Sequence, residues 1–195
     1  MRGRSRRAPA PGPRVGHDAP VPIDPPPAPS LSGRGVRLRL ATRSDLPALM
    51  ALVGEPDVAP WWPTWAPPEE EFLDPEVATY VIEAAGGAAG VLMFHEETTP
   101  GYRSAGMDIA VSGRFRGQGL GRRALALMAR HLFEARGHHR LTIDPAAANA
   151  RAIRAYRAIG FRDVGVMRRY ERGPDGEWRD GLLMDMLAGE LRDPR

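Results

Sequence analysis

Three closely spaced glycines interrupt the stretch RFRGQGLGRR at residues 114–123, between a segment with the alternation of a strand and a strongly helical segment. Such glycines allow a tight turn and a close approach of the backbone to a ligand. The last N–H groups of the turn also form the N-terminus of the following helix, where free donors and the helix dipole favour an anion. Four arginines in the same stretch add charge-assisted donors. The stretch therefore predicts a strand–turn–helix unit that binds an anion, and a tight turn without a ligand is the alternative.

The rest of the composition excludes several kinds of site. All 27 basic residues are arginine, so the lysine that a nucleotide-binding P-loop requires is absent. The glycine spacing G-x-G-x-G also differs from the G-x-G-x-x-G of dinucleotide-binding folds. The chain has no cysteine, which excludes disulfides, thiolate metal sites and a cysteinyl acyl-enzyme, and we expect no metal. No apolar segment approaches the length of a membrane span, so we expect a cytoplasmic protein without a membrane partner.

Residues 1–34 differ in composition from the rest of the chain. They hold nine of the 20 prolines and almost no residues that could form a packed face. This predicts a disordered or extended tail before a single domain at residues 35–195. The tail carries a net charge of +4 and the whole chain +3, so the domain itself carries −1. Because the domain is not basic, we expect no nucleic-acid partner, with an arginine-tailed nucleic-acid binder as the alternative.

Hydrophobic periodicity predicts an α/β domain with the element order βααβββαβαββ around a mixed sheet. The proline- and tryptophan-rich segment at residues 55–76 indicates a broken helix or loop after the first helix. The predicted strands are 36–40, 78–84, 90–97, 105–111, 139–143, 161–172 and 177–187, and the predicted continuous helices are 46–53, 120–136 and 148–159.

A second motif follows about thirty residues after the glycine-rich turn. The segment from Asn149 to Phe161 has the form N-x-x-A-x-x-x-Y-x-x-x-G-F, and residues 116–121 have the form R-x-x-G-x-G. Together they closely resemble the motifs of the GNAT superfamily of acyl-CoA-dependent N-acyltransferases, and the resemblance extends over residues 36–187. It implies the GNAT fold, a mixed, mostly antiparallel central sheet flanked by helices, and an enzyme that uses acetyl-CoA. The anion in the turn would then be the pyrophosphate of acetyl-CoA.

The resemblance also implies which residues bind acetyl-CoA. The glycine-rich turn would hold the pyrophosphate, the helix after Asn149 would lie along the pantetheine arm, and strand N–H groups near Ala110 could polarise the thioester carbonyl. The plain alternatives are helix capping for Asn149 and core packing for Tyr156. The residues expected to bind acetyl-CoA are Ile109, Ala110, Val111, Arg116, Gly117, Gln118, Gly119, Leu120, Gly121, Arg122, Asn149, Ala152 and Tyr156.

Two residues are catalytic candidates for proton transfer. Tyr156 resembles the tyrosine that protonates the departing CoA sulfur in this superfamily, and its reference pKa of about 10 suits that role. Asp108 lies one residue before the strand segment expected to hold the acetyl group. Its reference pKa of about 3.9 is far below that of an ammonium group, so a base at this position needs a pKa raised by burial. Otherwise Asp108 holds the ammonium while water or a second carboxylate relays the proton, or it is simply an exposed strand residue.

Four further segments, VAPWW, AGMDI, TIDPAAAN and DGLLM, resemble the aminoglycoside 6'-N-acetyltransferases. The resemblance implies that Trp61, Trp62, Asp108, Asp144 and Asp180 bind the amine substrate. Several carboxylates and aromatic walls suit a sugar that carries several ammonium groups. Core packing of the two tryptophans and turn capping by Asp144 are the alternatives.

Other classes of amine substrate stay open at this point. Siderophore-type lysine or hydroxylysine N-acyltransferases share these motifs but usually carry a histidine near the position of Asp108, and protein N-acetyltransferases require fewer carboxylates. Several aminoglycoside enzymes carry Asp-Pro in the loop where this chain has Thr99-Pro100. A non-enzymatic acyl-CoA-binding protein is the alternative from another class. We expect direct acetyl transfer to a small-molecule amine in a ternary complex, by a monomer or a homodimer.

Overall fold

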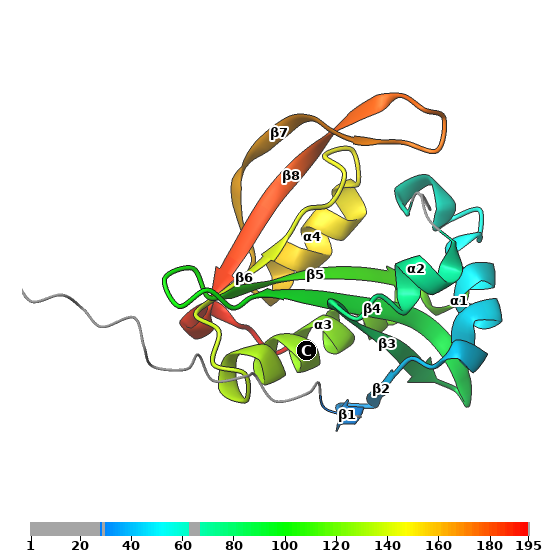
Figure 1. Ribbon diagram of the computed structural model, residues 1–195, viewed down its shortest axis with the longest axis horizontal. Coiled ribbons are helices and arrows are strands. Elements are labelled where there is room, and N and C mark those ends of the chain that lie inside the picture. The colour runs from blue at the N-terminus through cyan, green and yellow to red at the C-terminus, as the bar shows by residue number, and fades with distance from the viewer. Residues whose placement is uncertain (1–27, 29, 63–66, 195) are drawn as a thin grey trace, which may run out of the picture.

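In the computed structural model, the described residues (28, 30–62 and 67–194) form one eight-stranded sheet with helices on both faces (Figure 1). The strands lie in the order β1-β2-β3-β4-β5-β6-β8-β7, in which β5–β6 is the single parallel pair of the described sheet. The predicted α/β class with a mixed, mostly antiparallel sheet is therefore confirmed.

Most predicted elements are present, with ends shifted by a few residues. The segment at 55–76 contains two short helical pieces, as its prolines predict. In chain order the elements are β1 (Ser30–Gly33), β2 (Val36–Leu40), η1 (Arg43–Asp45), α1 (Leu46–Val53), η2 (Ala59–Trp61), α2 (Pro68–Phe72), β3 (Val77–Ala84), β4 (Gly87–Glu97), β5 (Ser104–Val111), η3 (Gly113–Phe115), α3 (Leu120–Glu134), β6 (Arg140–Ile143), α4 (Ala150–Ile159), β7 (Arg162–Arg172), β8 (Trp178–Leu187) and η4 (Ala188–Glu190).

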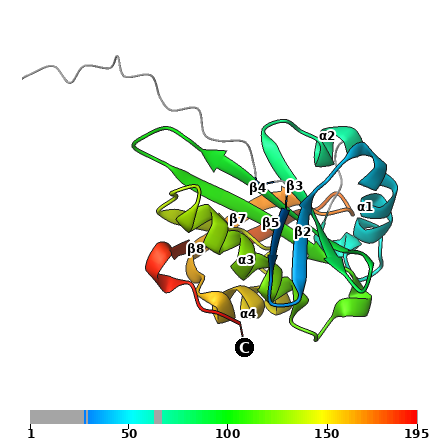
Figure 2. The same cartoon turned by 90° about the horizontal axis from the view of Figure 1, so that it is seen from below.

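Two hydrophobic clusters hold the helices against opposite faces of the sheet. Figure 2 shows α3 and α4 on one side of the strands and α1 and α2 on the other. On the α3 side, residues at helical spacing such as Leu120, Ala124 and Met128 are buried against the sheet. On the α1 side, Leu49 and Phe72 are buried in the second cluster. Among the described residues, no helix combines the length and apolar character needed to cross a bilayer.

The sheet divides between β5 and β6. These strands pair only at Ala105↔Leu141 and Gly106↔Thr142, whereas β5 pairs with β4 along its whole length to Val111. The carboxyl-terminal half of β5 therefore has no neighbouring strand on its β6 side. A gap of this kind at the carboxyl end of parallel strands is a common position for a ligand.

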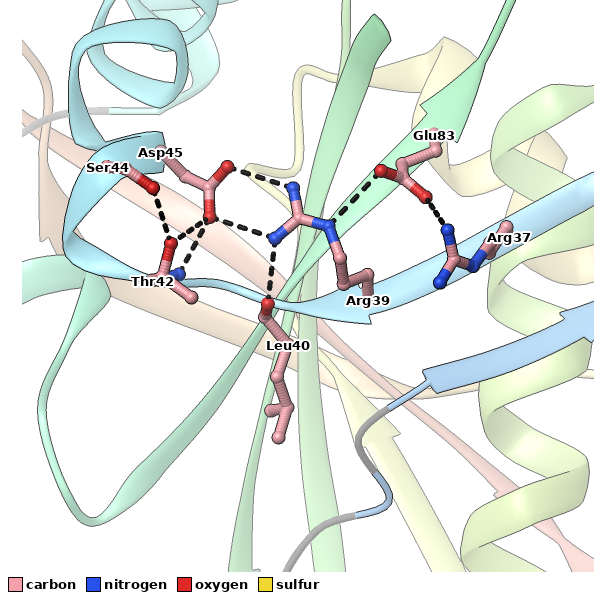
Figure 3. A network of polar contacts seen from close by, with 7 residues as sticks. All are labelled: Arg37, Arg39, Leu40, Thr42, Ser44, Asp45 and Glu83. Carbon is pink, nitrogen blue, oxygen red and sulfur yellow. Dashed lines mark hydrogen bonds and ion pairs between the residues drawn. The ribbon is translucent and has the colours of Figure 1, made fainter. Parts of the chain in front are cut away.

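A polar network fixes the junction between β2 and α1 (Figure 3). The Arg39 guanidinium donates to both Asp45 carboxylate oxygens at 2.9 Å and to a Glu83 oxygen at 3.1 Å. The Asp45 carboxylate also accepts the Thr42 N–H at 2.7 Å. Hydrogen bonding from Arg39 holds the pKa of Asp45 well below its usual range. The network therefore attaches α1 to the sheet and positions the segment that follows α1.

The first strand corrects one part of the sequence analysis. Residues 30–34 were predicted to belong to the tail, but β1 pairs with β2 over the register Ser30↔Arg39 to Gly33↔Val36. Tyr80 donates its hydroxyl to the Ala28 carbonyl at 2.7 Å, and Arg34 pairs with Asp193 at 3.0 Å. The stretch SLSG carries almost no hydrophobic signal, so its ladder hydrogen bonds could not be predicted from periodicity. Residues 1–27 and 29 lie outside the described residues, and their assignment to a tail stays a prediction.

Two truncations should separate the tail from β1. A chain that begins at Ala28 should keep the melting temperature of the full chain. A chain that begins at Gly35 also loses β1 and the Arg34 contacts, which we expect to cost about 2 kcal/mol. For a domain of this size that is roughly 4–8 °C in melting temperature. Thermal unfolding of both chains tests this, and equal melting temperatures would show that β1 contributes no stability.

Candidate active site

A cavity of about 330 Å³ opens where β5 and β6 diverge. Its walls come from β5, the turn before α3, the segment around η2, the loop after β6, the first half of α4, and β7. Most of the residues predicted for the site therefore meet at one cavity. Those that line it are Trp61, Trp62, Asp108, Ile109, Ala110, Val111, Arg116, Gly117, Gly119, Leu120, Gly121, Arg122, Asp144, Asn149, Ala152 and Tyr156.

The glycine-rich turn has the conformation that its sequence predicts. Gly117 and Gly119 have φ angles of +73° and +70°, a region that side chains with a Cβ rarely adopt. Gly119 is the N-cap of α3 and makes no side-chain cap, and the Arg123 N–H donates to the Gly119 carbonyl at 3.1 Å. The N–H groups of the first helical residues therefore have no acceptor within the helix. They lie at the cavity together with the Arg122 side chain, which fits a phosphate-bearing ligand.

Carboxylates from the segment after α1 anchor this turn. Glu55 accepts the Ser112 hydroxyl and the Gly113 N–H, both at 2.8 Å. Asp57 pairs with the Arg116 guanidinium, which also donates to the Asp57 carbonyl at 2.8 Å. Arg116 thus lines the cavity as predicted, but it is held by a carboxylate that sequence reasoning did not identify. The contacts of Glu55 and Asp57 connect the glycine-rich turn to the segment that contains Trp61 and Trp62.

Backbone donors of β5 face the gap. The ladder between β4 and β5 continues into the bond from the Ser112 N–H to the Ala89 carbonyl at 2.9 Å. Bonded and non-bonded pairs alternate along an antiparallel ladder, so the N–H groups of Ile109 and Val111 point away from β4 and into the gap. Both residues line the cavity. Donors fixed in this way can polarise a thioester carbonyl.

Helix α4 contributes Asn149 and Tyr156. The Asn149 side chain accepts the Ala152 N–H at 3.1 Å, so this residue is a helix N-cap, as the plain alternative stated, and it also lines the cavity. Tyr156 is 8% exposed and its ring packs edge-on against Phe161, with centroids 6.2 Å apart. Burial raises the pKa of Tyr156 above its usual value, and the negative charge of Asp108 adds to the shift. The Tyr156 hydroxyl is therefore protonated at neutral pH and available as a proton donor.

Asp108 lies on β5 with its side chain at the cavity. The residue is exposed, as the plain alternative stated, and its exposed surface faces the cavity, whose walls bring many protein atoms close to the carboxylate. Burial raises the pKa of Asp108 to about 7, with further contributions from the charges of Asp144 and Glu171. No hydrogen bond or ion pair of this side chain occurs among the described residues. An aspartate with this pKa can accept a proton near neutral pH, which its ordinary value would not allow.

The two tryptophans also line the cavity, from the segment after α1. Trp61 is 38% exposed, and Trp62 stacks on Phe72 with ring centroids 6.4 Å apart. The indole N–H of Trp62 donates to Glu71 at 2.8 Å. Trp62 thus packs partly into the second core cluster, as the plain alternative stated, while both rings still border the cavity.

Two predicted residues are not in the cavity wall. The Gln118 amide donates to the Arg114 carbonyl at 3.2 Å, so it shapes the turn from outside. The Asp180 carboxylate accepts the backbone N–H of Arg169 at 2.8 Å and does not line the described cavity. An aspartate in the last hairpin was expected to bind substrate, but strand position alone does not fix which neighbour a carboxylate contacts.

Residues of β7 that sequence reasoning missed lie at or near the part of the cavity that Asp108 and Asp144 line, which we call the acceptor side. Glu171 lines the wall, and Tyr170 lies near Asp144. Burial raises the pKa of Glu171, and the charge of Asp144 adds to the effect. Adjacent residues of a regular strand point to opposite faces, so no periodic signal could place both side chains at one site. Within the described ranges, no group of three or more His, Cys, Asp or Glu side chains could hold a metal ion.

Comparison with known proteins finds acetyltransferases, by sequence and by structure. A model described as the acetyltransferase (GNAT) family matches residues 46–161. The chain is 28% identical over 167 residues to aminoglycoside N(6')-acetyltransferase type 1 of Klebsiella pneumoniae, covering 74% of this chain and 81% of that protein. It is 27% identical over 164 residues to spermidine N(1)-acetyltransferase of Escherichia coli K12, covering 78% and 86%. The structure of Mycobacterium smegmatis RimJ in complex with CoA-disulfide matches with a TM-score of 0.71 and 27% identity, covering 81% of this chain and 84% of that one.

The matched family region includes both the turn before α3 and the motif on α4. The two motifs meet at one cavity whose free donors fit an acyl-CoA. The chain therefore belongs to the acetyltransferase (GNAT) family and is an acetyl-CoA-dependent N-acetyltransferase.

Proposed function

We propose that the acceptor is a small molecule with several amino groups, and that the reacting group is the 6'-amine of an aminoglycoside. The observation that carries this proposal is the acidic acceptor side of the cavity, where Asp108, Asp144 and Glu171 line the same cavity as two tryptophans. Carboxylates attract ammonium groups, and aromatic faces pack on the C–H faces of sugars. The relative from Klebsiella pneumoniae, named for N(6')-acetylation of aminoglycosides, supports the same class.

The arrangement supports direct transfer in a ternary complex. Asp108 accepts a proton from the bound ammonium, and the resulting neutral amine attacks the thioester carbonyl, forming a C–N bond while the C–S bond breaks. The N–H groups of Ile109 and Val111 stabilise the charge on the carbonyl oxygen. Tyr156 donates its proton to the departing sulfur, and the surplus proton that the acylated nitrogen then loses returns through water to the tyrosine oxygen, so the products are the amide and the CoA thiol.

Replacing Tyr156 with phenylalanine should lower turnover by about tenfold, because water can protonate a thiolate in place of the hydroxyl. Acetyl-CoA affinity should change little, since the ring keeps its packing on Phe161. The control is Tyr102→Phe, at a side chain that is 74% exposed in a loop away from the cavity. Turnover of Tyr156→Phe equal to that of the control would remove Tyr156 from the mechanism.

The amine class is tested by release of CoA thiol with acetyl-CoA and a panel of acceptors. The panel contains kanamycin, spermidine, hydroxylysine and an N-terminal alanyl peptide. We expect the highest kcat/KM for kanamycin. Spermidine is the second candidate, because the Escherichia coli relative is named for that polyamine. Preference for hydroxylysine or for the peptide would replace the proposed acceptor, and no release with any amine would favour a non-enzymatic acyl-CoA-binding protein.

A further inference from the structure

Strand β7 carries an irregularity beside the acceptor side of the cavity. Met167 pairs with Gly181 and Glu171 pairs with Arg179, so four steps along β7 match two steps along β8. Within this bulge Arg169 has a φ of +52°, which is unusual for a residue with a side chain. Bulges of this kind redirect side chains next to active sites. Here Glu171 lies in the cavity wall, and its neighbour Tyr170 lies near Asp144, another residue of that wall.

Asp180 and Gly181 on β8 build the bulge. The Asp180 carboxylate accepts the Arg169 N–H at 2.8 Å, which compensates a donor that the irregular ladder would leave unpaired. Gly181 leaves space for the Tyr170 ring, because an added Cβ would lie 2.9 Å from its Cδ1 atom. On its other edge β8 is fixed to the loop after β6, where the Ala147 N–H donates to the Asp180 carbonyl at 2.8 Å.

The Glu171 carboxylate is available to a ligand. It is half-buried, and among the described residues it makes no hydrogen bond or ion pair. Its cross-strand neighbour Arg179 uses its guanidinium elsewhere, with one nitrogen on the Pro60 carbonyl at 3.0 Å and the other on Asp175 at 2.8 Å. These contacts hold the tip of the β7–β8 hairpin toward the segment between α1 and α2 (Figure 1). A half-buried carboxylate without a partner is costly unless a cation binds it.

Resting on the proposed acetylation of a multiply charged amine, we propose that the β7 bulge recognises the acceptor. In this assignment Asp180 is a positioning residue that holds the bulge, and Glu171 binds a second cationic group of the acceptor, separate from the amine that is acetylated. Asp108 lies on β5 and Glu171 on β7, on the two sides of the divided sheet. The acceptor therefore spans the gap with at least two positive charges.

The test uses the full chain and kanamycin as the probe. Glu171→Gln should raise the KM for kanamycin about tenfold, since a charge-assisted contact is lost, with kcat within about twofold. Glu177→Gln removes the same charge from an exposed position on the same hairpin and should leave both constants unchanged. Asp180→Ala should raise the KM in the same way, whereas Asp180→Asn should restore the wild-type KM because its side-chain oxygen can still accept the Arg169 N–H. Calorimetry of kanamycin with the CoA-bound proteins measures binding apart from turnover.

The outcomes distinguish the proposed roles of Glu171 and Asp180 from the proposed identity of the acceptor. Binding and KM of Glu171→Gln equal to those of Glu177→Gln overturn the assigned role of Glu171, even if kanamycin is acetylated. Equal effects of Asp180→Asn and Asp180→Ala overturn the positioning role, because they show that the charge of Asp180 acts directly. Failure of the wild-type protein to acetylate kanamycin overturns the proposed acceptor alone if Glu171→Gln still weakens binding, and both proposals if kanamycin does not bind.

Discussion

Asp108→Asn is expected to lower acetyl transfer by about two orders of magnitude or more while leaving acetyl-CoA affinity unchanged. Loss of a general base has this scale, and asparagine keeps the size of the side chain without its basicity. Acetyl-CoA affinity should be preserved because the N–H groups of Ile109 and Val111 belong to the backbone. Calorimetry with acetyl-CoA and turnover on kanamycin measure the two quantities on the same protein. Near wild-type turnover of the variant would make Asp144 the next candidate for the base.

The pH dependence of the wild-type enzyme follows from the same residue. Because the pKa of Asp108 is raised to about 7, kcat/KM should increase with pH as this carboxylate ionises and should fall below pH 7 as it is protonated. Asp108→Asn should lose this decrease in kcat/KM at low pH.

The raised pKa of Asp108 also means that folding stability decreases as pH rises from about 4 to about 7. The variant should therefore be at least as stable as the wild type at pH 8, which separates a catalytic defect from a folding defect.

Gly119→Val should weaken acetyl-CoA binding roughly a hundredfold. Valine strains a backbone with a φ of +70°, and its side chain lies 3.3–3.5 Å from guanidinium nitrogens of Arg123 and Arg122. The helix N–H groups and Arg122 would then lose their arrangement, and one or two charge-assisted hydrogen bonds of about 1.5–3 kcal/mol each would be lost.

A matched control separates this effect from backbone strain. Gly86 has a φ of +79° in the β3–β4 turn, away from the cavity, and an added Cβ there contacts nothing within 4 Å. Gly86→Val should therefore cost similar stability but leave acetyl-CoA binding unchanged, as isothermal titration would show. Equal affinities of the two valine variants would contradict the assignment of the turn to acetyl-CoA.

Local pattern was enough to predict most of the fold and most of the residues that the turn before α3 and helix α4 place at the cavity. The period of α3 and the alternation of β5 are set by which residues are buried, and the glycines of the turn are required by its left-handed backbone. The edge strand β1 was missed because SLSG forms its ladder through backbone bonds. Long-range contacts were also beyond reach, such as the pairing of Asp57 with Arg116.

The residues of the acceptor side were predicted less completely, because their positions depend on long-range contacts. Asp144 and Asp108 follow simple strand positions and do line the cavity. Asp180 was expected to bind substrate but accepts the Arg169 N–H, whereas Glu171, for which no role was expected, lines the cavity, because the bulge in β7 shifts the register between the two strands. Neither glycine nor proline marks this bulge, since the residue with positive φ is Arg169. A register shift of this kind depends on the tertiary structure around it.

We propose that this cavity transfers acetyl directly from acetyl-CoA to the 6'-amine of an aminoglycoside, with Asp108 as the base. Mass spectrometry with fragmentation of kanamycin after incubation with acetyl-CoA and the wild-type protein tests it most directly, with Asp108→Asn in parallel. We expect one acetyl group on the 6'-nitrogen with the wild type and about a hundredfold less product with the variant. Acetylation at another nitrogen, or equal product from both proteins, would contradict the account.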